Sequence, residues 1–381
     1  MMSSPLLLLA ILCGSVVLSE WLVRRTFLRH FGTALVVIVV VAVWANLGLI
    51  PSASQGSVVY DGIFRYLAPL SIFYLLLDVN LASIRRAGAP MLGLFVLGSA
   101  ATALGVFAGM FVVDGPTHFG EFYPAISGMF TGTYTGGSVN YNAIAIHYDM
   151  MREGILYAGM TAVDNIITAV WMVVTLAVPL LFRRRDVINP GPAEATEDVE
   201  RATESVSVLS IGVLLGIGFL SLAAADGLAT ALENGGLNVP SILVLTTIAL
   251  LLAQVPALHR LAGGQVVGLF FVYLFLAVIG AFCELAALGQ IGDLAWRLLF
   301  MVCVTVVVHG TIVFGGARLM KLDMDVAAVA SQANIGGSSS SLALAKSLNR
   351  MDLYLPGILV GSLGNGLGTY LGFLVAGLVA P

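Results

Sequence analysis

Two glycine pairs, each set among small polar residues, are the part of this sequence best suited to binding chemistry. One lies in TGTYTGGSVNYNAIA, residues 131–145, and the other in SQANIGGSSSSLALA, residues 331–345. Glycine lets a backbone turn sharply and approach a ligand closely, and hydroxyl and amide groups can bind a polar solute or Na+. The candidate substrate-binding residues are Thr133, Thr135, Gly136, Gly137, Ser138, Asn140, Asn142, Asn334, Gly336, Gly337, Ser338, Ser339 and Ser340, with Ser341 beside them.

Asp164 is the candidate for coupling-ion binding. It is the only acidic side chain deep inside an expected membrane span, and an intramembrane carboxylate is costly and marks an ion or proton site by default. Asn165 and Asn365 are expected beside the glycine tips and join it in the ion-coupling set, with Na+ possible at Asp164 and Asn365. The alternative is a structural carboxylate hydrogen-bonded to neighbouring helices. His309 could relay protons, but we favour a histidine whose ring is satisfied by its neighbours.

The composition requires a membrane protein to hold these residues. Of 381 residues, 59% are hydrophobic and 10% charged, against roughly 25% charge in soluble domains, and the mean hydropathy is +1.00. The net charge is -4 and the 17 basic residues are dispersed, so nucleic acid is not an expected partner. The three cysteines lie far apart and indicate neither disulfides nor a metal site. We expect an all-α polytopic membrane protein.

Ten apolar runs are long enough to be transmembrane helices, at about 20 residues each. The only long polar stretch, residues 183–204, divides them into a first repeat at 1–182 and a second at 205–381, and we expect it to be a cytoplasmic linker. The start of the chain lacks a basic segment before its apolar run, so it is expected to be a span and not a signal peptide. The runs lie at about 5–23, 31–50, 62–79, 90–113, 154–182, 205–225, 240–256, 264–285, 294–316 and 353–380.

The two halves are related by a constant offset. A shift of 200 residues aligns both glycine pairs, lays Asn165 on Asn365, and carries the run near 90–113 onto the one near 294–316. An unbroken offset with parallel order of the apolar runs predicts an internal duplication.

The positive-inside rule predicts how the repeats are oriented. If both glycine segments dip into the membrane and return, 14 of the 17 basic residues lie inside and 3 outside; if both cross, the division is 9 against 8. The first arrangement is preferred. It makes the repeats inverted, each with five transmembrane helices and one broken, re-entrant Gly-Gly hairpin, and places both termini outside.

Broken backbone inside a bilayer is tolerated only where protein or a water-filled cavity covers it, because unpaired polar groups are costly there. Hairpin arms of about 13 residues reach roughly 19 Å, so two tips entering from opposite faces should meet near the middle. Helices that start at the tips offer N-terminal amides, which suit a carboxylate. The alternative is that the small residues only let helices pack closely.

The motifs TYTGGSVNYNA and ANIGGSSSS, each followed by an apolar helix with a polar centre, resemble the YjcL-like family of uncharacterised membrane proteins (domain of unknown function 819). More distantly, the paired hairpins look like those of sodium-coupled glutamate and citrate carriers. That likeness implies that the hairpin tips hold substrate and Na+, and that a core moves against a dimeric scaffold. This chain differs in having no arginine beside either tip and only Lys346 near, which disfavours a multiply charged anion.

The sequence therefore predicts a secondary transporter of the bacterial inner membrane that moves a carboxylate or amino acid by alternating access, coupled to Na+ or H+. No cofactor and no enzymatic activity are expected; membrane lipid, a small-molecule substrate and a second copy in a homodimer are the expected partners. One alternative is a cation/proton antiporter that uses Asp164. Others are a passive channel and an intramembrane hydrolase using Ser138 or Ser338 with His309, although no hydrolase motif is present.

Overall fold

The computed structural model of the protein is all-helical in the residues it describes. They are 4–30, 32–52, 55, 57–182, 206–237, 239–258, 261–283 and 292–380. The linker expected at 183–204 lies outside this part of the chain.

The first half contains three apolar segments followed by a longer helix, a broken pair and a final helix. Proline stands in the first turn of several of them, where its missing N–H costs no hydrogen bond. The elements are α1 (Pro5–Arg25), α2 (Gly32–Asn46), α3 (Val58–Gly62), α4 (Ala68–Leu76), α5 (Ala89–Val112), α6 (Gly115–Phe119), α7 (Tyr123–Gly136), α8 (Ser138–His147) and α9 (Gly154–Phe182), with short helical turns η2 (Ile63–Leu67), η3 (Leu81–Ala87), η4 (Gly120–Phe122) and η5 (Met150–Arg152) between them.

The second half repeats this order. Its elements are α10 (Val208–Asn234), α11 (Ser241–Leu252), α12 (Gly264–Ala281), α13 (Gly292–Leu319), α14 (Met324–Ser347), η9 (Met351–Leu353) and α15 (Tyr354–Val379). The turns η5 and η9 each precede the last helix of a half, and Asp149 and Asn349, 200 residues apart, both adopt positive φ angles of 53° and 58°. The offset seen in the sequence therefore recurs in backbone conformation.

Seven helices of the described chain are long and apolar enough to cross a membrane, or eight if one bent pair counts as a span. The pair is Val58–Leu76 with Leu81–Ala87, bent by 50°. Two of the ten expected spans correspond to shorter helices, since α2 has 15 residues and α11 has 12. Large apolar side chains such as Val173 and Leu220, which are 66% and 72% exposed, face outward, as lipid contact requires.

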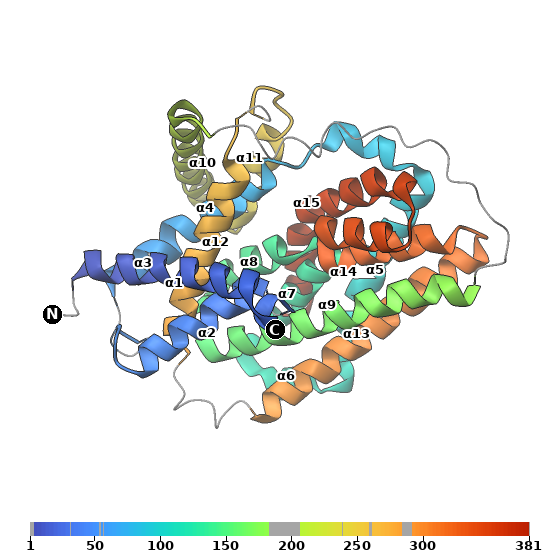
Figure 1. Ribbon diagram of the computed structural model, residues 1–381, viewed down its shortest axis with the longest axis horizontal. Coiled ribbons are helices and arrows are strands. Elements are labelled where there is room, and N and C mark those ends of the chain that lie inside the picture. Colours follow the sequence, from blue (N-terminus) through green and yellow to red (C-terminus); the bar gives the residue numbers. More distant parts are fainter. Residues whose placement is uncertain are drawn as a thin grey trace.

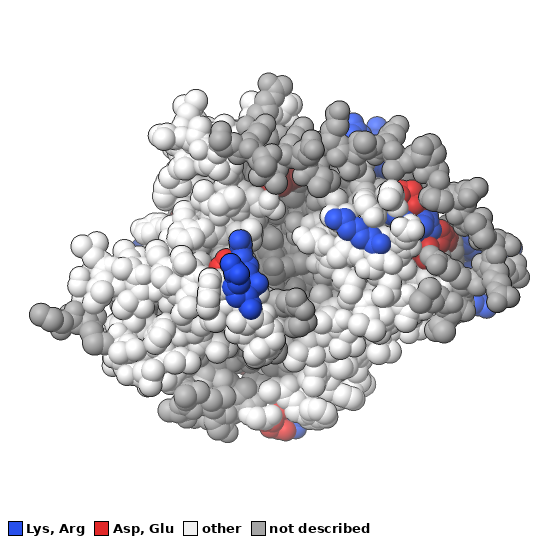
Figure 2. Space-filling view, viewed as in Figure 1, with Lys and Arg blue, Asp and Glu red and all other residues white. Residues whose placement is uncertain are grey.

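The helices form two groups (Figure 1). The first, here called the flanking bundle, contains α1–α4 and α10–α12, in which α12 packs on α2 and α4. The second, the hairpin bundle, contains α5, α7–α9 and α13–α15, in which α7 packs on α15 and α5 on α13. Few charged side chains appear on the face shown in Figure 2, and they gather in small groups.

Glycines let the central helices of the hairpin bundle approach at backbone distance. A methyl group added to Gly105 would lie 2.6 Å from the carbonyl oxygen of Thr305, and one on Gly109 would lie 2.5 Å from that of Met301. Because residue numbers rise along α5 as they fall along α13, these two helices, which correspond under the 200-residue offset, run antiparallel.

Candidate functional site

The first glycine segment is a helical hairpin. Helix α7 ends at Gly136, Gly137 has φ 113°, and α8 begins at Ser138. A methyl group added to Gly128 would lie 3.2 Å from Ile144, and one on Gly132 would lie 3.1 Å from Asn140 Cβ. Residues before the break therefore lie beside residues after it, so α8 folds back along α7.

The second glycine segment has the same form. Gly337, at φ 76°, interrupts α14. A methyl group on Gly357 would lie 2.8 Å from Val329 and 3.3 Å from Ser341, whereas twelve residues of straight helix span about 18 Å. The two ends of α14 also meet, because Arg350 Nη1, just after the helix, lies 2.6 Å from Asp323 Oδ2 at its start.

The two hairpin tips are in contact, as the sequence predicted. A methyl group added to Gly337 would lie 3.1 Å from the carbonyl oxygen of Gly136 and 3.8 Å from Gly137 Cα. One on Gly136 would overlap the backbone of Gly364, and one on Gly137 would lie 3.7 Å from Asn365 Oδ1. The tips and α15 thus meet through backbone, with Asn365 beside the first tip as expected.

Both hairpin tips have polar groups that a ligand could contact. No side chain caps the start of α8, and Ser138 is exposed. At the second tip Ser339 is exposed, while Gly336 and Ser338 are half-buried. An anion approaching here would meet the positive end of a helix dipole.

Most of the other predicted ligands already have hydrogen-bond partners within the protein. Asn140 donates to the Gly364 carbonyl at 3.0 Å and accepts from Thr369 at 2.8 Å. Asn142 accepts from the hydroxyl of Tyr157. The hydroxyls of Thr135, Ser340 and Ser341 donate to backbone carbonyls of their own hairpins, and Thr133 is 1% exposed. These residues build the hairpins; their role as substrate ligands stays a prediction.

Asp164 lies among phenols. It interacts electrostatically with Tyr134, Tyr141 and Tyr157, which come from α7, α8 and α9. The hydroxyl of Tyr134 and Oδ1 of Asp164 are both buried; they interact with each other, and neither has a further hydrogen-bond partner. Buried polar atoms without partners are rare in proteins, so this pair is the strongest indication of a ligand site in the described chain.

Three further buried polar atoms lack partners. They are Nδ2 of Asn165, Nε2 of Gln332 and Oδ1 of Asn334. Gln332 and Asn334 stand in the first arm of α14, close to its tip, and Asn334 Nδ2 binds the carbonyl of Thr135 at 3.3 Å across the hairpin contact. Unsatisfied polar groups therefore lie on both sides of the place where the hairpins meet.

His309, by contrast, is fully satisfied and lies 0% exposed. Its Nδ1 is 3.1 Å from the Gly98 carbonyl, which can only accept, so Nδ1 carries the proton. Its Nε2 is 2.9 Å from the Ser331 hydroxyl. That hydroxyl accepts a hydrogen bond from Trp171 Nε1 at 3.0 Å, so its own proton can be donated to Nε2 of the histidine ring. The favoured interpretation of a hydrogen-bonded, neutral histidine fits this network.

We expect His309→Phe to lower the free energy of unfolding by about 2 kcal/mol, because Ser331 and the Gly98 carbonyl would stay buried without their partner. Thermal unfolding of the purified protein measures this, with His118→Phe, at an exposed position, as the control near wild type. A variant of wild-type stability that had lost proton coupling would favour the relay instead.

Sequence reasoning missed the phenols and Arg350. Tyr134 and Tyr141 flank the first glycine pair within the motif itself, so their presence on both arms was a usable signal. Asp226 was likewise not recognised as a carboxylate inside a helix. It lies within α10 because that helix extends to Asn234. It is exposed and accepts a hydrogen bond from Ser241.

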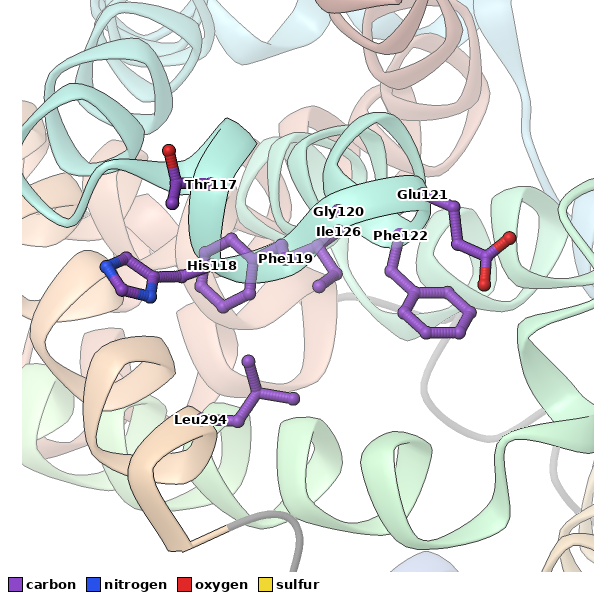
Figure 3. Close-up of a pocket in the computed structure, with 8 residues that line it drawn as sticks. All are labelled: Thr117, His118, Phe119, Gly120, Glu121, Phe122, Ile126 and Leu294. Atoms are coloured by element: carbon purple, nitrogen blue, oxygen red, sulfur yellow. The ribbon is translucent and has the colours of Figure 1, made fainter.

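Two cavities lie away from the hairpin tips. One of about 280 Å³ is bordered by α6, η4 and the start of α13, with His118, Glu121 and Leu294 in its lining (Figure 3). The other, of about 250 Å³, is lined by α2 and α9 residues and by Cys283. In the described part of the chain no three His, Cys, Asp or Glu residues are grouped as metal ligands.

Comparisons with known proteins extend over almost the whole chain. A family described as "Protein of unknown function (DUF819)" matches residues 7–380. The "Uncharacterized membrane protein YjcL" of Bacillus subtilis (strain 168) is 26% identical over 349 residues, which cover 87% of this chain and 85% of that protein. Both glycine pairs and Asp164 lie inside the family match.

Proposed function

Since this chain belongs to the DUF819 family of membrane proteins, whose description names no activity, we propose its function from the site: a secondary transporter that moves a carboxylate or amino acid by alternating access, coupled to Na+ or H+. The observation that carries the proposal is the contact between two glycine-tipped helical hairpins, together with Asp164, whose Oδ1 is buried and faces Tyr134 of the first hairpin. Such broken helices are tolerated in a membrane where they line a binding site.

The antiparallel packing of corresponding helices supports inverted repeats. When α5 and α13 occupy equivalent places in the two halves and run in opposite directions, a two-fold axis perpendicular to both relates them. For helices that cross a membrane this axis lies in the membrane plane. Each hairpin would then return to the side from which it entered, and the ion pair of Arg350 with Asp323 at the base of the second hairpin supports this.

The division into bundles supports a moving part and a fixed part. The hairpin bundle contains both tips and Asp164, and it corresponds to the expected core at 90–182 and 294–381. The flanking bundle would be the scaffold, through which two copies would form a dimer in the inner membrane, with both termini outside.

Uptake into proteoliposomes tests the proposal. A thermal-shift screen of amino acids and monocarboxylates, with and without Na+, first selects solutes, because a ligand at 100 times its dissociation constant stabilises by about 2.7 kcal/mol. We expect at least one selected solute to accumulate when a Na+ or H+ gradient is imposed and not after ionophores collapse it. Uptake of every solute that ignored both gradients would contradict the proposal.

The second candidate is a cation/proton antiporter, favoured by the lone carboxylate Asp164. Vesicles containing a pH-sensitive dye would then respond to Na+ or K+ pulses without any organic solute. Asp164→Asn would abolish that response. If the protein is instead a solute symporter, wild-type vesicles would already give no response to these pulses.

A further inference from the structure

We infer that Asp164 binds a proton, and not Na+, as the coupling ion. The inference rests on the proposed transport function and chooses between the two ions that it leaves open. It is drawn from the groups around the carboxylate and from the backbone oxygens close to it.

Asp164 has no charged partner in the described chain. No ion pair joins it to a lysine, arginine or histidine, and the Tyr134 hydroxyl is the one side-chain group of the described chain that interacts with it as a hydrogen-bond donor. A carboxylate without a cationic partner is costly in a medium of low polarity, and taking up a proton removes the charge.

The titratable groups around Asp164 are neutral in the ordinary pH range. From α7, α8 and α9 they are Tyr134, Tyr141 and Tyr157. From α13, Cys303 acts on Tyr134, and His309 is engaged by Gly98 and Ser331. In α2, α12 and α14, which also pack on α9, the charged residues are those near the ends of α14, Asp325 and Lys346, and Tyr273 stands in α12.

The Tyr134 hydroxyl can form a hydrogen bond with Asp164 whether the carboxyl group is ionised or protonated. When Asp164 is ionised, the phenol O–H can donate to the carboxylate. When a proton has added to Oδ1, the new O–H of the carboxylic acid can donate to the phenol oxygen. The two side chains already interact with each other, and neither has another partner, so together they are sufficient for binding one proton.

A sodium site needs several oxygen ligands, which broken transporter helices supply largely as free carbonyls. Here three of the four carbonyls of residues 133–136, at the end of α7, are occupied. That of Thr133 accepts from Gly137 N at 2.7 Å, that of Tyr134 from Thr102 at 2.8 Å, and that of Thr135 from Asn334 at 3.3 Å. Asp164 itself lies within the long helix α9, whose carbonyls serve the helix.

Thermal unfolding of the full chain in detergent tests the inference without a transported solute. Wild type and Asp164→Asn are compared from about pH 5 to about pH 9, and at fixed pH in NaCl against choline chloride of equal ionic strength. Asparagine imitates the protonated acid. We expect wild type to match Asp164→Asn in acid and to fall a few degrees below it as the pH rises, with no stabilisation specific to Na+.

Asp114→Asn is the matched control, because Asp114 is exposed and asparagine tolerates its left-handed backbone; its profile should follow wild type. If Asp164→Asn does not fold, Tyr134→Phe replaces it. Because the phenol no longer donates to the ionised carboxylate, we expect its loss of stability with rising pH to extend to higher pH than in wild type.

The inference would be overturned if the pH profiles of wild type and Asp164→Asn were parallel. Where Asp164→Asn does not fold, parallel profiles of wild type and Tyr134→Phe would overturn it. So would a Na+-specific stabilisation that either variant abolished. Failure of the transport proposal gives a different pattern, in which the protonation signature is present while no solute accumulates in vesicles.

Discussion

Gly136→Ala should lower the free energy of unfolding by about 2 to 3 kcal/mol and abolish gradient-driven uptake. A methyl group at this position would overlap the backbone of Gly364. Backbone cannot move aside as a flexible side chain can, so α15 and the first hairpin would have to separate. Thermal or denaturant unfolding in one detergent, together with vesicle uptake, measures both effects.

Gly315→Ala is the control for this change. Gly315 also lies in a helix of the hairpin bundle, but an added methyl group would have no atom within 4 Å. Alanine favours helix by about 0.5 to 1 kcal/mol over glycine, so this variant should be as stable as wild type or slightly more so. Equal stability of Gly136→Ala and Gly315→Ala would mean that the tip does not depend on backbone contact.

Arg350→Gln should be the second most damaging change, at about 2 kcal/mol. Arg350 binds Asp352 at 2.7 Å, Asp323 at 2.6 Å and Asp325 at 2.9 Å. The hydrogen bond to Asp352, followed by those to Asp323 and Asp325, raises the pKa of the guanidinium above its ordinary value. The Asp325 side chain is only 8% exposed, and removing Arg350 takes a cationic partner from a buried carboxylate, which is destabilising.

The effect should be confined to the second hairpin, whose two ends Arg350 joins. Hydrogen exchange of α14 measures this, and we expect faster exchange there than in α7 and α8. Arg297→Gln is the control, because its partner Asp293 is 76% exposed and exposed pairs contribute little. Uniform exchange across both hairpins would contradict the assignment.

The sequence was sufficient to locate the hairpin breaks because the signal is local. Two adjacent glycines within a polar stretch, repeated at one offset, identify a chain that turns, and Gly137 and Gly337 have the positive φ angles that glycine favours. The contact of the tips was predicted from the arm lengths and the constant offset of 200 residues. The family was also identified correctly from the paired motifs.

The hydrogen-bond partners of the polar residues could not be predicted, since they depend on distant contacts. Asn140 is paired with Thr369, 229 positions away, so a side chain that looks free in the motif is already engaged. Helix lengths were equally hidden: α2 ends at Asn46, whose side chain donates to the Cys283 carbonyl at 2.8 Å. Apolar composition indicates that a segment lies in the membrane or in the protein interior, but it does not indicate the residue at which the helix ends.

The offset of 200 places Gly364 opposite Asp164. In the first half this position carries an acidic group, and in the second it is bare backbone in close contact with Gly136. If the two halves are the inverted repeats that we propose, they are not chemically equivalent, and an ion or solute would meet a different environment from each side of the membrane. Under the proposed function, the acidic side chain available for ion binding at this position would then belong to the first half alone.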